Sequence, residues 1–70
     1  MKFDHTLFSN ELFKLRKKRF QTLDDVSFAT KISSPHLWRI ENGQAKNPDM
    51  KTVLSVCTWM NKPINNFIKN

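Results

Sequence analysis

Seventy residues, 39% of them hydrophobic, are enough for one domain with a small and marginally stable core, which dimerisation would strengthen. The single cysteine excludes an internal disulfide, no Cys and His set has the number and spacing of a structural zinc site, and no apolar run approaches the roughly 20 residues of a membrane span. Twelve Lys and Arg against six Asp and Glu give a net charge of +6 and a pI near 9.9, so polyanions are the expected partners.

The first residues, MKFDHTLF, show no helical period. We expect an N-terminal arm over residues 1–8, with terminal disorder as the default and a strand in a dimer or a lid over the core as alternatives. His5 is expected to be an ordinary surface residue.

The domain over residues 9–70 opens with a helix that Ser9 is expected to cap. Its inner face carries Leu12, Leu15 and Arg16. An unpaired buried charge is very costly, so Arg16 needs an acidic partner. Glu41, on the inner face of a later helix, is the only acid that the pattern places there. We therefore expect a structural ion pair between Arg16 and Glu41.

A second helix is predicted from Leu23, because Thr22 can cap it and two aspartates place negative charge in its first turn. Its apolar positions are Leu23, Val26 and Ala29. Lys31 interrupts this pattern. Phe28 projects outward, either to pack under the N-terminal arm or to meet a protein partner.

A third helix is predicted to begin at Ser34, with Ser33 as its cap and Pro35 in its first turn. At about 100° per residue, its inner side carries Leu37, Ile40 and Glu41, its outer side Pro35, Arg39 and Asn42, and its flanks His36 and Trp38. Gly43 supplies the stop. Two short helices joined by a tight turn, with an exposed cationic face, are typical of a helix-turn-helix unit.

These residues resemble the lambda-repressor-like (Cro and CI, or XRE) helix-turn-helix domains over about Leu12 to Ile68. The matching motifs are Arg16, Thr22-x-x-Asp25-Val26-Ser27, Ile32-Ser33, Leu37-x-Arg39-Ile40-Glu41-Asn42-Gly43 and Asn47-Pro48. The resemblance implies an all-α, compact five-helix domain and the same Arg16 to Glu41 pair. Lys31 and Phe20 stand where the family usually has Gly, and Thr30 replaces an apolar core residue.

A polar loop, closed by Pro48, follows the third helix and is either a phosphate-binding loop, as in similar family members, or an ordinary connection. A fourth helix, capped by Asp49, is predicted to bury Met50, Val53, Val56, Cys57 and Met60. Pro63 starts a last short helix in which Phe67 closes the core. Trp59, expected to be exposed, and Ile64 are candidates for a dimer surface, since related domains pair through this end.

Side-chain chemistry assigns the expected contacts with DNA. Base edges would be contacted by Ser34, Pro35, His36 and Arg39. Phosphates would be held by Thr22, Ser33, Asn42, Gln44, Lys46 and Asn47. Capping alone remains an alternative for Thr22 and Ser33, and Trp38 is expected either beside the groove contact or in the packing.

The sequence thus predicts a DNA-binding transcriptional regulator, a Cro/CI-like repressor that binds a palindromic operator as a homodimer. The alternative is a protein-interaction module, such as a toxin-neutralising antitoxin or a repressor controlled by an anti-repressor; Phe28 and Trp59 favour it. No enzyme is expected, because no nucleophile and base pair, paired carboxylates or metal set can be defended, and no cofactor or membrane contact is expected. The expected location is the cytoplasm of a bacterial cell, on the nucleoid when bound to DNA.

Overall fold

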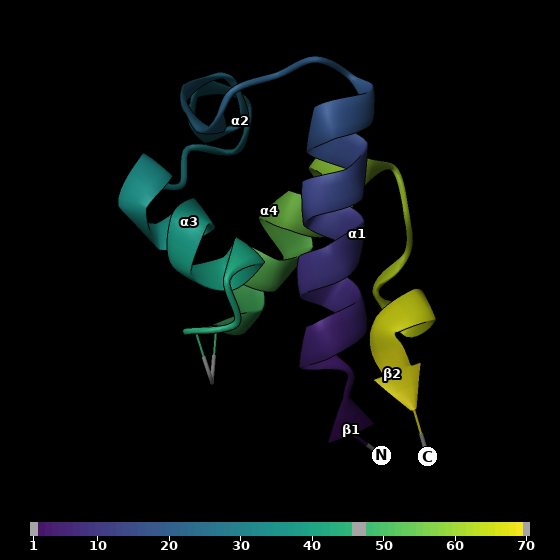
Figure 1. Cartoon of the computed structure of the whole chain (residues 1–70). Helices are drawn as coiled ribbons and strands as arrows, with labels where there is room; N and C mark the ends of the chain where they lie inside the picture. The colour runs from purple at the N-terminus through teal and green to yellow at the C-terminus, as the bar shows by residue number, and fades with distance from the viewer. Residues whose placement is uncertain (1, 46–47, 70) are drawn as a thin grey trace.

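The chain folds into a mostly helical structure in the computed structural model, which describes residues 2–45 and 48–69 (Figure 1). Its elements are β1 (Lys2–Phe3), α1 (His5–Lys18), α2 (Leu23–Thr30), α3 (Ser34–Glu41), α4 (Met50–Met60), a 3-10 turn η1 (Ile64–Phe67) and β2 (Ile68–Lys69). The described residues therefore contain four α-helices. The fifth helix expected from the sequence is a single 3-10 turn.

The N-terminal segment is not a separate arm, and the prediction that Ser9 caps the first helix is wrong. Helix α1 begins at His5, because the Asp4 side chain accepts a hydrogen bond from the Leu7 amide at 3.0 Å. Phe8, in the first two turns, is 1% exposed and packs edge-on against Phe67. Asp4 is thus the cap in place of Ser9, and burial of the Phe8 ring stabilises the first part of the helix.

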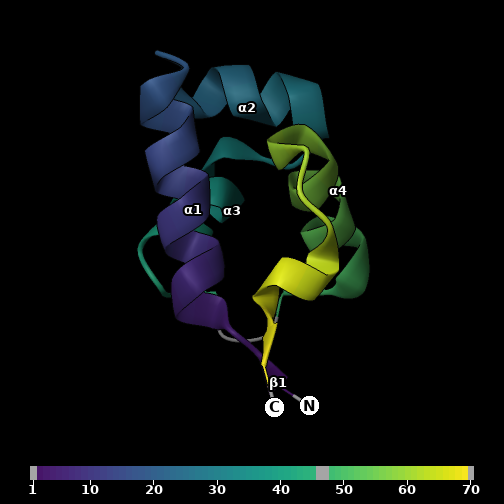
Figure 2. The ribbon, with the colours of Figure 1, turned by 90° about the vertical axis from the view of Figure 1, so that its right-hand side faces the viewer.

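The two ends of the chain lie side by side (Figure 2). Strands β1 and β2 pair antiparallel, with Phe3 opposite Ile68, and the Asp4 amide donates to the Phe67 carbonyl at 2.6 Å. Residues 2 and 3 thus form a strand paired within their own chain, in place of the default expectation of terminal disorder or the alternative of a strand in a dimer. This pairing fixes the start of α1 against the end of the chain.

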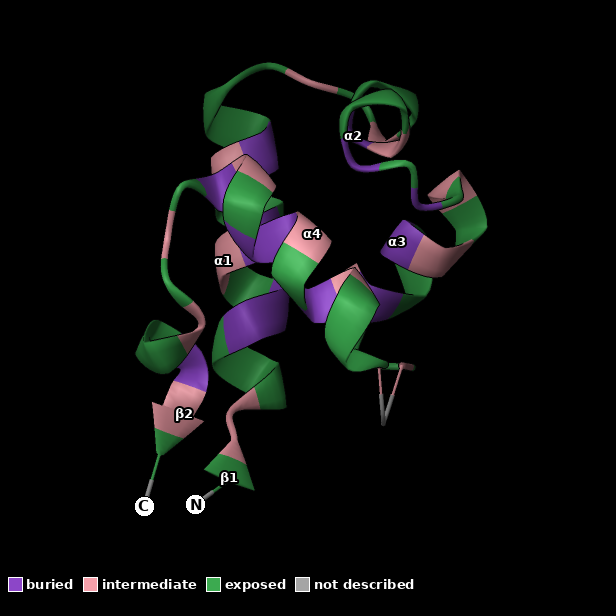
Figure 3. Ribbon diagram, turned by 180° about the vertical axis from the view of Figure 1, so that it is seen from behind, coloured by how far each residue is buried: buried purple, intermediate pink, exposed green. Residues whose placement is uncertain are grey.

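The core lies between the four helices and η1, and the buried stretches of the ribbon are purple in Figure 3. It consists of Phe8, Leu12, Val26, Ile32, Leu37, Ile40, Val53, Val56, Cys57, Met60 and Phe67. The stripe predicted for α4 is confirmed except at Met50, which is 61% exposed. Met50 is the first residue of α4, and at this N-terminal end of the helix its side chain is not covered by the core. Ala29, expected on the inner side of α2, is also exposed.

Helices α2 and α3 begin where their caps predict. Thr22 accepts from the Asp25 amide while the Asp25 carboxylate accepts from the Thr22 amide at 2.8 Å, a reciprocal capping box. Ser33 accepts from the His36 amide at 3.3 Å, with a proline in the first turn. Each helix has only eight residues, so the four N-terminal amides without an intrahelical partner are a large part of its backbone. The caps accept hydrogen bonds from some of these amides.

The three positions at which the sequence differs from the family pattern are accommodated locally. Lys31 and Phe20 both adopt left-handed backbone conformations, with φ of +63° and +55°. Thr30 is buried, and its hydroxyl donates to the Val26 carbonyl at 2.8 Å, so it carries no unpaired donor into the core. Left-handed backbone at a residue with a Cβ costs about 1–2 kcal/mol, so Lys31 and Phe20 store some strain.

Candidate nucleic-acid interface

Helix α3 presents one face to solvent, and this face carries most of the predicted base-contacting residues. Pro35, Trp38, Arg39 and Asn42 are exposed, while Ser34 and His36 are half-buried. Leu37 and Ile40 lie on the opposite side in the core. We call the four exposed residues, together with Ser34 and His36, the α3 face.

Two polar members of the α3 face are already hydrogen-bonded within the protein. The Ser34 hydroxyl donates to the Asp24 carboxylate in the first turn of α2, at 2.5 Å. The Asn42 side-chain amide donates to the Trp38 carbonyl at 2.8 Å. Within residues 2–45 and 48–69, the Arg39 side chain makes no hydrogen bond or ion pair. Arg39 is therefore the cationic side chain on this face that remains free to bind a ligand.

The predicted phosphate contacts lie at the ends of α2 and α3, and all those described are exposed. Thr22 and Ser33 use their hydroxyls as caps, and these oxygens accept amide protons as described above. The backbone amide of Gln44 donates to the backbone carbonyl of Arg39 at 2.8 Å, and residue Gln44 is exposed. Lys46 and Asn47 lie outside the described residues.

The α3 face is held in place by an ion pair on the other side of the helix. Arg16 Nε donates to Glu41 Oε2 at 2.7 Å and Arg16 Nη2 to Glu41 Oε1 at 3.0 Å, a bidentate contact between α1 and α3. Arg16 Nη1 also donates to the Gln21 carbonyl at 3.0 Å. The hydrogen bond to Glu41 raises the pKa of Arg16. The pair expected from the sequence is thus present, and its position at the base of α3 gives it a structural role.

A cationic groove beside the α3 face was not anticipated from the sequence. His36 lies on one wall, and Lys31, in the α2–α3 connection, and Lys51, in the first turn of α4, also line this groove of about 410 Å³. The hydroxyls of Thr30, Ser33, Thr52 and Ser55 complete its lining. The two lysines are 20 positions apart in the sequence, and the packing of α4 against α2 brings them to the same groove.

The candidate dimer residues are less exposed than expected. Trp59 is half-buried, packs against the core and has the Arg19 guanidinium 4.6 Å from its ring centre; Arg19 also donates to the Trp59 carbonyl at 2.9 Å. Ile64 is partly buried against the core as well. The expectation of an exposed Trp59 is therefore wrong, because the end of α1 covers it. Phe28 is 89% exposed, so it does not pack under the N-terminal segment.

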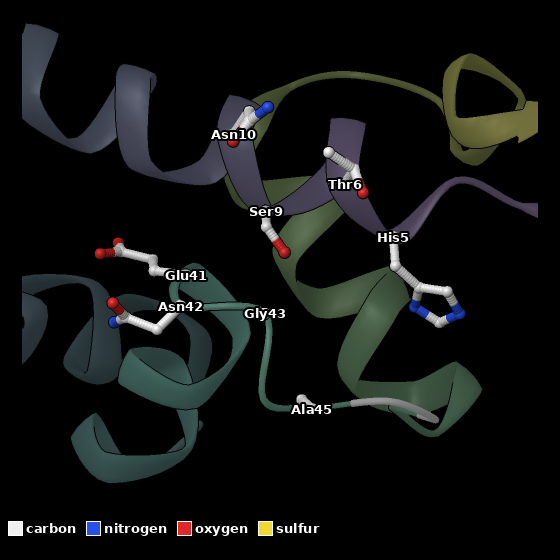
Figure 4. A pocket seen from close by; sticks show the side chains of 8 residues that line it. All are labelled: His5, Thr6, Ser9, Asn10, Glu41, Asn42, Gly43 and Ala45. Atoms are coloured by element: carbon white, nitrogen blue, oxygen red, sulfur yellow. The ribbon is translucent and has the colours of Figure 1, made fainter.

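A polar hollow of about 470 Å³ lies between α1 and the end of α3 (Figure 4). Its walls are His5, Thr6, Ser9 and Asn10 from α1 and Glu41, Asn42, Gly43 and Ala45 from α3 and the following loop. The Glu41 carboxylate is engaged by Arg16. Besides His5 and this carboxylate, the hollow offers hydroxyl and amide groups, and no hydrogen bond joins the Ser9 hydroxyl to His5 among the described residues.

Cys57 is buried in the core, and burial raises the pKa of its thiol. Among residues 2–45 and 48–69, no three His, Cys, Asp or Glu side chains are grouped so that they could hold a metal ion. In the same part of the chain, none of the helices has the length and apolarity needed to cross a membrane.

Comparison with protein-family models, with curated proteins and with solved structures found no match.

Proposed function

We propose that this chain is a sequence-specific DNA-binding transcriptional regulator of the lambda-repressor-like helix-turn-helix class. The observation that carries the proposal is the α3 face, on which Arg39 lies exposed on a short, capped helix and is bonded to no described residue. A helix of this size fits the major groove of B-DNA, and arginine is the side chain that most often contacts guanine there. The net charge of +6 favours a polyanionic ligand.

The surroundings of the α3 face support the same ligand. The bidentate Arg16–Glu41 pair holds α3 against α1, so the orientation of the face does not depend on the ligand. Thr22 and Ser33 mark two helix N-termini at which phosphate oxygens would find amide protons and a favourable dipole. Lys31 and Lys51 add positive charge beside the face, where the phosphates that flank a major groove would pass.

A homodimer is part of this proposal, because two copies of α3 about 34 Å apart would contact two half-sites of a palindrome on one side of the duplex. Repression would follow from occupation of a promoter, and the protein would act in the bacterial cytoplasm, on the nucleoid. Trp59 and Ile64 remain the proposed pairing surface. Since both are partly buried against the core, pairing would use their outer edges together with neighbouring exposed residues.

The test is selection of bound fragments from random duplex DNA by the purified protein and by Arg39→Ala, with Lys14→Ala as a control that removes an exposed charge from α1. We expect an inverted repeat to be enriched. Arg39→Ala should lose about 1–3 kcal/mol of specific affinity and relax the preference at one base pair, while nonspecific binding changes little. Equal weakening on all sequences would make Arg39 a phosphate contact, and enrichment of no sequence would refute the proposal.

The second candidate is a protein-interaction module, an antitoxin or a repressor under the control of an anti-repressor. It is favoured by Phe28, whose ring is almost fully exposed on α2 without an evident role in DNA binding. Sequence-blind, salt-sensitive DNA binding, combined with stoichiometric binding of a protein that Phe28→Ser abolishes, would favour this function over the first.

A further inference from the structure

Trp38 is a large apolar side chain in an unusual place for one. It lies on the solvent side of α3 and is 47% exposed. Trp59, by comparison, is half-buried, packs against the core and has Arg19 over its ring. The apolar surface that Trp38 leaves in contact with water is unfavourable, and a ligand that covered this surface would gain free energy of binding.

The polar groups around Trp38 are less available than the sequence indicates. One turn before it, the Ser34 hydroxyl is bound to Asp24, and one turn after it, the Asn42 amide is bound to the Trp38 carbonyl. Pro35, one turn away on the same side, has no side-chain donor. What the α3 face offers along this edge is therefore mainly apolar, beside the single free cation of Arg39.

We infer that Trp38, with Pro35, contacts the 5-methyl groups of thymines next to the base pair that Arg39 contacts. This inference rests on the proposed function and adds a base preference to it. The thymine methyl is the apolar feature of base edges in the major groove, and it stands beside hydrogen-bonding positions that suit an arginine. Trp38 and Arg39 are consecutive residues, so their side chains leave α3 in directions about 100° apart and would reach neighbouring base pairs.

A duplex edge suits this surface better than a protein partner does. The cation beside the tryptophan is Arg39. Lys31 and Lys51 extend the positive charge to the His36 side of the helix, and the Asp24 carboxylate is bound to Ser34. A polyanion that carries small apolar groups matches both properties. Phe28, the other strongly exposed aromatic considered above, lies on α2 and shares none of these neighbours on the α3 face.

The experiment uses the selected operator and replaces its thymines one at a time by uracil. Uracil keeps the pairing with adenine and the O4 acceptor in the major groove and removes only the methyl group, so the affinity ratio of thymine to uracil reports the methyl contact. We expect a loss of about fourfold at one or two positions in each half-site, the factor that corresponds to about 0.8 kcal/mol for one buried carbon. These positions should adjoin the base pair at which Arg39→Ala relaxes the preference.

The same ratio is then measured for Trp38→Ala, with Phe28→Ala as the matched control for loss of an exposed aromatic ring. Trp38→Ala should bind the thymine duplex more weakly and show a thymine-to-uracil ratio clearly below that of the wild type, and Phe28→Ala should keep the wild-type ratio. Trp38→Phe, which keeps an apolar ring, should retain part of the effect and serves as the second variant should Trp38→Ala not fold.

Specific binding without any uracil effect would overturn this inference and leave the proposed function intact. A uracil effect of undiminished size in Trp38→Ala would also overturn it, since the tryptophan would then contribute nothing to the methyl contact. Absence of sequence-specific binding by the wild-type protein would refute the proposed function and this inference together.

Discussion

Replacement of Glu41 by alanine should destabilise the fold rather than weaken DNA binding alone. The Arg16 and Glu41 side chains are only 11% and 4% exposed, and Glu41 accepts two of the three hydrogen bonds that the guanidinium makes. Without the Glu41 carboxylate, the buried Arg16 guanidinium retains only its hydrogen bond to the Gln21 carbonyl. Removal of one partner from a buried pair costs about 3–5 kcal/mol, and the surviving hydrogen bond favours the lower end.

This cost is large for so small a domain. A chain of 70 residues has a total free energy of unfolding of roughly 3.5–10 kcal/mol, at about 0.05–0.15 kcal/mol per residue. A loss of about 3 kcal/mol should lower Tm by roughly 12–24 °C. Thermal unfolding followed by circular dichroism, supported by urea titration, measures the change. DNA binding by Glu41→Ala should be lost at temperatures where the variant is unfolded and retained where it is folded.

Glu11→Ala is the matched control. Glu11 accepts from Lys62 Nζ at 2.9 Å, a distance close to that of the buried pair, but the two side chains are 28% and 37% exposed. The hydrogen bond from Lys62 lowers the pKa of Glu11, yet an exposed pair of this kind contributes only about 0–1 kcal/mol. The double variant Arg16→Met with Glu41→Leu should regain most of the stability. A Tm of Glu41→Ala no lower than that of Glu11→Ala would refute the reasoning.

The remaining predictions concern one strained residue, one buried thiol and one charge beside the α3 face. Lys31→Gly should raise the free energy of unfolding by about 0.5–1 kcal/mol, because glycine adopts the left-handed conformation without strain and loses only a modest amount of entropy on folding. Lys14→Gly, in the middle of α1, should lower the free energy of unfolding by about 1 kcal/mol. Urea titration of both variants measures the two changes. Burial raises the pKa of Cys57, so the stability that this thiol contributes is complete below its unfolded pKa of about 8.5 and is lost as pH rises through the folded pKa. The free energy of unfolding of the wild-type protein should therefore fall at alkaline pH, and the part of this fall that is due to the thiol should be absent in Cys57→Ala. If the two proteins lose stability equally as the pH rises, the prediction is wrong. Lys51→Ala should weaken binding on all duplexes and reduce the salt slope by about one, while Lys2→Ala on β1 should not; an unchanged slope would remove Lys51 from the interface.

The local signals in the sequence were sufficient for the boundaries of α2 and α3. Thr22 and Ser33 cap these helices as predicted, because a capping side chain bonds to amides two or three positions away and needs no distant partner. The core stripe of α4 from Val53 to Met60 also followed from helical spacing. The Arg16–Glu41 pair could be inferred at long range because a buried charge permits very few partners.

Other features depended on contacts between segments that are far apart in the sequence. The first turn of α1 is buried because Phe8 meets Phe67 and the two chain ends pair, and Trp59 is half-buried because Arg19 lies over its ring. Neither contact leaves a local pattern in the sequence. Periodicity specifies which side of a helix is apolar, but only packing decides which segment covers that side.

The chemistry of the α3 face was likewise divided between sequence and tertiary structure. The sequence determined which side chains point outward from α3, because the helical repeat alone sets their directions. The tertiary structure decided which of them are free: Ser34 is bound to Asp24 on α2, while Arg39 is not engaged by any described residue, and Lys31 and Lys51 are brought to the edge of the face. A hydrogen bond between helices depends on their relative position, and this position is fixed by the burial of a shared core.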